Sequence, residues 1–133
     1  MPQVNWLAVI VAAIAMFGLG ALWYSPMLFV KQWAKAAGIT REGSPGPNFI
    51  WIMAGSFVLT LIMAANLAFF LAGPNTTLGF AVGAAIAAGL GWATLSLWII
   101  SLFEQRPFAY VLINGGYLTV GFALMGLILG LWR

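Results

Sequence analysis

Long apolar stretches separated by short polar segments dominate the chain. The apolar stretches cover about residues 4–24, 49–71, 78–103 and 108–132, and no charged residue lies between Glu42 and Glu104. Each stretch exceeds the ~20 residues that a helix needs to cross about 30 Å of hydrocarbon. Two prolines and two glycines fall in the segment 43–47, and polar turns are predicted at 73–76 and 104–107. The pattern predicts an all-α integral membrane protein, a single domain of four transmembrane helices.

One further helix is predicted between the first and second spans, over residues 26–38. Trp23 and Tyr24 end the first span, and such side chains favour the level of the lipid headgroups. Pro26 is well suited to the first turn of a new helix. Apolar residues share one side of a helical wheel: Phe29, Val30, Trp33, Ala36 and Ala37. Lys31 and Lys35 lie on the other side. The pattern favours a short amphipathic helix lying in the membrane interface. A cytoplasmic extension of the first span is the alternative, which Pro26 disfavours.

The basic residues predict how the chain is oriented. Lys31, Lys35, Arg41 and Arg106 fall in the first and third loops, and Arg133 alone falls on the other side. Cytoplasmic loops carry an excess of Lys and Arg. We therefore expect the first and third loops in the cytoplasm and both termini outside, in a bacterial inner membrane.

Composition narrows the class of protein. Hydrophobic residues make up 64% of the chain and charged residues 5%, whereas a soluble domain has about 45–50% and about 25%. Cys and His are both absent, which argues against zinc, haem and iron–sulfur sites, so no metal or cofactor is predicted. The five basic residues are too scattered for a nucleic-acid surface. The predicted surroundings are a lipid bilayer.

Glycines at intervals of four predict close helix packing. Gly79, Gly83 and Gly91 form such a series with Ala87 in the third span, and Gly126 and Gly130 do so in the fourth. Small residues at this spacing let a second helix backbone approach closely. The favoured interpretation is packing within the four-helix bundle, and a dimerisation face is the alternative.

Polar side chains within the predicted spans are all neutral. They include Ser56, Thr60, Asn66, Thr94, Ser96, Asn114, Tyr117 and Thr119. Asn114, Tyr117 and Gly121 share one helix face. The favoured role of Asn114 is an interhelical hydrogen bond, and contact with a ligand stays open. No nucleophile–base pair or phosphate-binding loop is found, so an enzyme is not expected.

Two motifs carry a resemblance to a known family. The first is Gly20-Ala21-Leu22-Trp23-Tyr24-Ser25-Pro26, followed by Phe29 and Trp33. The second is Leu112-Ile113-Asn114-Gly115-Gly116-Tyr117, with Met125-Gly126 and the terminal Leu131-Trp132-Arg133. The chain resembles, over nearly its whole length, the bacterial membrane family catalogued as domain-of-unknown-function family 1761.

The resemblance implies a four-helix membrane protein with no assigned activity. It also implies that six residues fall on the family's signature positions: Trp23, Tyr24, Pro26, Trp33, Asn114 and Tyr117. These residues either bind a ligand or hold the interfacial helix against the bundle.

The predicted function is a structural or accessory role, through helix association with copies of itself or with a larger membrane complex. The alternative is an oligomeric transporter or channel for a neutral or amphipathic small solute. A lipid- or pigment-contacting subunit of an energy-converting complex is a third hypothesis.

Overall fold

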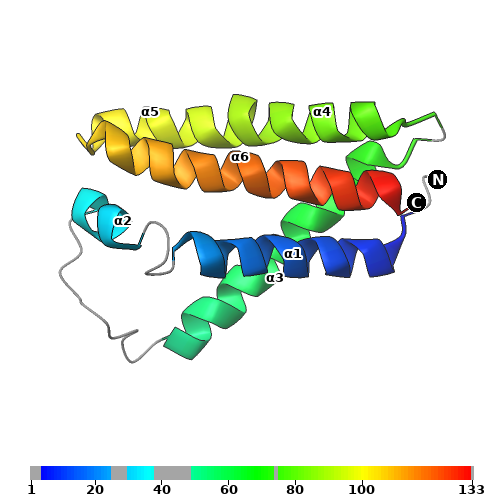
Figure 1. Cartoon of the computed structure of the whole chain (residues 1–133), viewed down its shortest axis with the longest axis horizontal. Coiled ribbons are helices and arrows are strands. Elements are labelled where there is room, and N and C mark those ends of the chain that lie inside the picture. The colour runs from blue at the N-terminus through cyan, green and yellow to red at the C-terminus, as the bar shows by residue number, and fades with distance from the viewer. Residues whose placement is uncertain (1–3, 25–29, 38–48, 74, 133) are drawn as a thin grey trace.

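Four helices long and apolar enough to cross a membrane run through the computed structural model of the chain, which describes residues 4–24, 30–37, 49–73 and 75–132 (Figure 1). They are α1 (Trp6–Trp23), α3 (Phe49–Leu71), the continuous rod α4 (Leu78–Ala88), η1 (Gly89–Thr94) and α5 (Leu95–Phe103), and α6 (Phe108–Leu131). The four predicted spans are confirmed, with boundaries shifted by one or two residues at most. No strand occurs in the described residues.

Side-chain caps explain where two of the spans begin. The Asn5 side chain accepts a hydrogen bond from the backbone N–H of Ala8, and Thr77 does the same for Phe80. Each cap satisfies a backbone donor that a helix start leaves without a partner. Asn5 also donates to the backbone oxygen of Trp132 at 3.3 Å, so the start of α1 lies against the end of α6.

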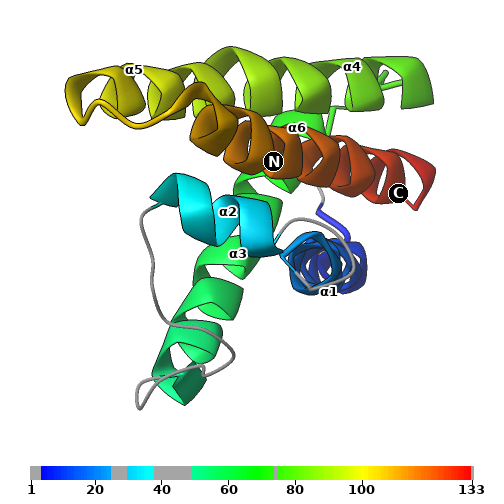
Figure 2. The same cartoon turned by 60° about the vertical axis from the view of Figure 1, so that its left-hand side comes forward.

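The predicted helix between the first two spans is present as α2 (Val30–Ala37). Its Lys31 and Lys35 are exposed and Trp33 is half-buried, which matches the predicted division into a polar and an apolar face. The predicted ends of this helix at Pro26 and Gly38 lie outside the described residues. α2 lies beside the first turns of α6, at the end of the molecule opposite to the start of α1 (Figure 2).

The central helix is α6. It lies between α1 on one side and the α4–η1–α5 rod on the other, and in the described residues it contacts every other helix (Figure 1). Helix α3 crosses α1 obliquely and diverges from the rest. Its buried residues all fall in its second half, from Thr60 to Leu71, whereas Ile50 and Trp51 are each 77% exposed.

Glycines of α6 allow this packing. A Cβ added at Gly126 would meet Ala85 Cβ and would lie 2.9 Å from the backbone oxygen of Ala81. At Gly130 an added Cβ would lie 2.8 Å from Ala81 Cβ. Real Cβ atoms do not approach other atoms this closely, so α4 can reach α6 only where α6 has no side chain. The two glycines therefore lie in a helix–helix contact inside the bundle.

The glycine series of the third span faces the other way. Gly79, Gly83 and Gly91 are exposed, and a Cβ added at Gly83 or Gly91 would meet nothing within 4 Å. At Gly79 the one atom within 4 Å belongs to the neighbouring Thr77. The structure thus does not place this series in the bundle interior, contrary to the favoured interpretation.

A different face of the α4–η1–α5 rod lies against α6. Its buried residues are Ala81, Ala85, Gly89, Thr94 and Ser101. The spacing is four, four, five and seven, and the interval of five coincides with the π-helical turn η1. A π-turn adds one residue to a helical turn. It keeps Thr94 on the face that Ala81, Ala85 and Gly89 occupy.

The two glycine environments predict opposite responses to a methyl group. Gly126→Ala should lower the free energy of unfolding by about 1–3 kcal/mol, because the new Cβ overlaps α4. Gly83→Ala should leave it unchanged or raise it by up to about 1 kcal/mol, since alanine favours the helix and meets no neighbour. Unfolding in mixed detergent–SDS micelles, followed by circular dichroism, measures both. Equal changes in the two variants would contradict the assigned packing.

Candidate functional site

The end of α1 is fixed to α6 by two hydrogen bonds. Trp23 Nε1 donates to the backbone oxygen of Ile113 at 2.8 Å. The hydroxyl of Tyr24 donates to Asn114 Oδ1 at 2.5 Å. A Cβ added at Gly116 would lie 2.9 Å from the Trp23 ring, so the indole reaches α6 over a position without a side chain. Both bonds join residues about ninety positions apart in the chain.

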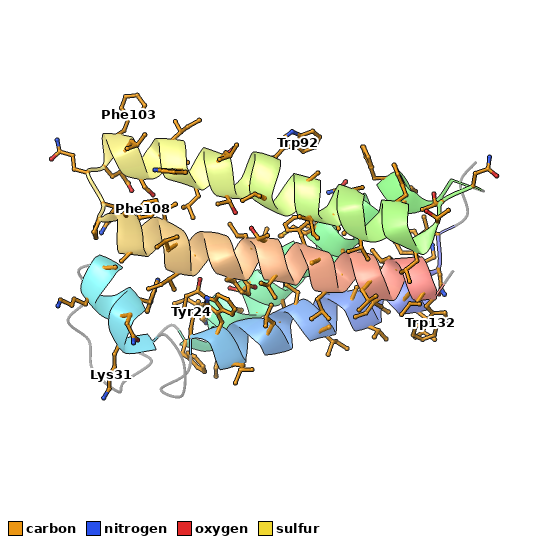
Figure 3. All side chains as sticks on the ribbon, turned by 45° about the horizontal axis from the view of Figure 1, so that its top comes forward. Tyr24, Lys31, Trp92, Phe103, Phe108 and Trp132 are labelled. Atoms are coloured by element: carbon orange, nitrogen blue, oxygen red, sulfur yellow. The ribbon has the colours of Figure 1, made fainter. Side chains whose placement is uncertain are left out.

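Aromatic rings extend this contact to α2. The ring of Tyr24 lies edge-on to Trp33 of α2 and to Tyr117 of α6, with ring centroids 5.5 Å apart in both pairs. This is a preferred geometry for aromatic pairs. Tyr117 in turn lies over Gly20, where an added Cβ would be 3.2 Å from the ring. Figure 3 shows Tyr24 at the end of α1.

Five of the six signature positions therefore come together: Trp23, Tyr24, Trp33, Asn114 and Tyr117. We refer to them as the signature cluster. Pro26, the sixth, lies outside the described residues. The cluster joins three elements that are far apart in sequence, and its rings and amide are all half-buried. It has the geometry of a brace between α1, α2 and α6.

A second polar contact lies one residue further along α6. The hydroxyl oxygen of Thr94 is 2.7 Å from Gly89 O, 3.1 Å from Gly115 O and 3.2 Å from the Thr119 hydroxyl. Its contact with Gly89 O lies within the π-turn and spans five residues, the spacing of the π-helical bond. An added Cβ at Gly115 would lie 2.5 Å from the Thr94 methyl group. Sequence reasoning missed this contact, although the pair Gly115-Gly116 is the signal that two neighbours approach α6 here.

Donors remain free in the signature cluster. Asn114 Nδ2 and the Tyr117 hydroxyl make no hydrogen bond to any other residue that the structure describes. They could bind an acceptor group of a neutral molecule. Neither group is a strong base, and neither is a nucleophile with a base beside it. In the described ranges, no group of three His, Cys, Asp or Glu residues could hold a metal ion.

The turn between α5 and α6 carries two charged residues that are not part of the signature cluster. Glu104 and Arg106 form an ion pair with 3.7 Å between nitrogen and oxygen, and the Arg106 guanidinium lies 5.5 Å from the Tyr110 ring centre. Both are exposed. Exposed pairs of this kind contribute about 0–1 kcal/mol, so the pair marks a polar surface at the end of α5.

A groove of about 650 Å³ lies elsewhere, between the second half of α3 and the α4–η1–α5 rod. Two polar residues line it, Asn66 of α3 and Ser96 of α5, and both are exposed. Their side chains make no hydrogen bond to another described residue. Both residues were identified from the sequence as polar residues within spans, but the sequence did not predict that they line the same groove.

Four helices long and apolar enough to cross a membrane define the class of polytopic helical membrane proteins. The chain belongs to the family described as "Protein of unknown function (DUF1761)", whose model matches residues 7–130. The resemblance found in the sequence is thereby confirmed. No curated protein and no solved structure matches the chain.

The bond between Tyr24 and Asn114 can be tested by a double-mutant cycle. Tyr24→Phe and Asn114→Ala should be coupled by about 0.5–1.5 kcal/mol in unfolding, because each single change removes the same hydrogen bond. Unfolding in mixed micelles gives the four free energies. Tyr117→Phe is the matched control, since its hydroxyl has no bond to lose among the described residues. Additive effects of the two changes would disprove the bond.

Proposed function

We propose that the protein is a structural or accessory membrane protein, which acts by lateral association with copies of itself or with a larger membrane complex. One observation carries the proposal: the small-residue face of α4 and η1 formed by Gly79, Gly83 and Gly91 points out of the bundle. Ala87, also exposed, continues this outward face.

The lipid around the helices is the reason why a small-residue face favours association. Lipid tails are as apolar as leucine, so apolar area alone does not drive helices together in a membrane. Close backbone approach does, because it adds dispersion contacts and weak hydrogen bonds. The inward contact at Gly126 and Gly130 shows the same chemistry at work within this chain. The outward face offers an equivalent surface to a helix from another molecule.

The proposal includes no enzymatic step. The polar groups that the structure describes inside the spans are amides and hydroxyls, and Tyr24–Asn114 is a donor–acceptor pair rather than a nucleophile–base pair. The second candidate, an oligomeric transporter or channel for a neutral or amphipathic solute, is favoured by the groove that Asn66 and Ser96 line.

We further propose a bacterial inner membrane, with α2 and the α5–α6 turn on the cytoplasmic side and both termini outside. Lys31, Lys35 and Arg106 support this orientation, because α2 and the turn lie at one end of the molecule (Figure 1). The opposite end, with the α3–α4 turn, has no basic residue in the described ranges. The polar face of α2 further supports its placement in the membrane interface.

Cysteine cross-linking in native membranes tests the association. The natural chain has no cysteine, so a single Gly83→Cys variant can form a disulfide only with another molecule. If the protein associates with itself, we expect a disulfide-linked homodimer after oxidation. If the partner is another protein, we expect native mass spectrometry to detect a complex of fixed stoichiometry that contains this chain. Ile10→Cys is the control, because Ile10 is an exposed residue of α1 and lies outside the small-residue face of α4 and η1.

The same surface can be blocked without disturbing the fold. Gly83→Leu should abolish the association, whereas Gly18→Leu, which also meets no neighbour within 4 Å, should leave it intact. A protein that runs as a lone monomer from its own membranes and in nanodiscs would refute the proposal.

The orientation makes a separate prediction. On intact cells, a membrane-impermeant maleimide should label Asn75→Cys in the α3–α4 turn but not Gln32→Cys on α2; both positions are exposed. Permeabilising the cells should make Gln32→Cys reactive. The reverse pattern would show that the chain is inserted the other way round.

A further inference from the structure

The groove between α3 and the α4–η1–α5 rod has the dimensions and lining of a binding site. Its volume of about 650 Å³ lies within the range of about 300–1,000 Å³ that is usual for small-molecule sites. It exists because α3 diverges from the rod after the short turn that joins them (Figure 2). The groove is partly open rather than an enclosed cavity, so an occupant would enter sideways from the bilayer.

The walls of the groove favour a flat, uncharged occupant. Aromatic residues from four elements line it: Phe70, Phe80, Trp92 and Phe122. Ala84 and Ala88 also line the groove, and their small side chains leave room for a ring. Among the residues that the structure describes, no charged one lines the groove, and an ion would lose its hydration without a counter-charge. Aromatic rings gain most from another planar π-system, stacked or edge-on.

The polar side chains of Asn66 and Ser96 determine which polar groups an occupant of the groove needs. Asn66 offers amide N–H donors and Ser96 an O–H donor. Neither side chain has a hydrogen-bond partner among the described residues. An amide without a partner in hydrocarbon is costly, and an acyl chain in the groove would leave that cost in place. An occupant with acceptor oxygens would remove it.

The π-turn contributes to this wall as well. Trp92 and Ala93, both in η1, line the groove, and Ser96 follows one turn later. Figure 3 shows Trp92 pointing away from α6, and its side chain is 71% exposed. π-turns inside α-helices are frequent at functional sites. Here the turn directs Thr94 inward and leaves Trp92 outward.

From these observations we infer that the groove binds a neutral, lipid-soluble molecule whose planar ring carries carbonyl oxygens, of the quinone type. Asn66 and Ser96 donate hydrogen bonds to the carbonyl oxygens, and the aromatic side chains enclose the ring. The ring's apolar tail extends into the bilayer through the open side. The groove shares Ala87 with the small-residue face, but Asn66, Ser96 and the aromatic lining lie outside that face, so this binding does not rest on the proposed association.

Decylubiquinone is the probe for the test, with the full chain purified into phospholipid nanodiscs. Binding is followed by quenching of tryptophan fluorescence. The nanodisc lipids are themselves competitors, so saturable binding shows a preference for the ring over acyl chains. Asn66→Leu should raise the apparent Kd about tenfold, which corresponds to the loss of about 1.4 kcal/mol. Ser96→Ala should raise it severalfold, and Trp92→Phe should remove most of the quenching.

Matched controls separate a site from a general effect. Ser56→Ala and Trp51→Phe alter the same residue types on α3 outside the groove, and both should bind within twofold of the natural chain. Each variant's thermal midpoint verifies that it is folded. Asn66→Leu should leave the Gly83→Cys cross-link unchanged, because Asn66 lies on α3 and outside the small-residue face, so failure of the association and failure of the groove are distinguishable. Unsaturable quenching, or Asn66→Leu binding as tightly as the natural chain, would overturn the inference.

Discussion

Close approach to α6 is the constraint on which the other helices depend. In hydrocarbon there is no hydrophobic force between apolar helices, so backbone proximity and hydrogen bonds hold them together. Residues Gly115, Gly126 and Gly130 open one side of α6 to the rod, and Gly116 and Gly121 open another to α1. At each of these five positions an added Cβ would overlap a neighbouring side chain or backbone. The bundle is therefore organised around the positions where α6 has no side chain.

One short stretch of α6 also fixes the rotation of its neighbours. The oxygens of Ile113 and Asn114 accept hydrogen bonds from Trp23 and Tyr24, and Gly115 O shares the single hydroxyl proton of Thr94 with Gly89 O. Two of these acceptors are backbone carbonyls inside a helix, which use a second lone pair for the contact. Because the three acceptors are consecutive, they point in different directions around α6. The end of α1 and the π-turn are thus held on separate sides of the same turn of helix.

The sequence predicted what depends on local pattern and missed what depends on which face of a helix is used. Length and hydropathy define the four spans, and the placement of apolar residues on one side of a helical wheel defines α2. The third span, however, carries small residues on two faces, and periodicity alone could not tell Ala81, Ala85 and Gly89 from Gly79, Gly83 and Gly91. The extra residue of η1 and the divergence of α3 have no local signal. The family resemblance identified Tyr24 and Asn114, but nothing in the sequence paired them.

Hydroxyl and amide side chains differ in how they can be accommodated in such a protein. Thr60 and Ser101 donate to the carbonyl four residues earlier in their own helices, at 2.7 Å, which satisfies the hydroxyl without a second helix. An amide has two N–H donors and one oxygen, more than one helix carbonyl can satisfy. Asn114 uses its oxygen for Tyr24, whereas Asn66 faces a groove with no described partner. Among the described residues of α3, Asn66 is therefore the one that gains most from a bound molecule with hydrogen-bonding groups.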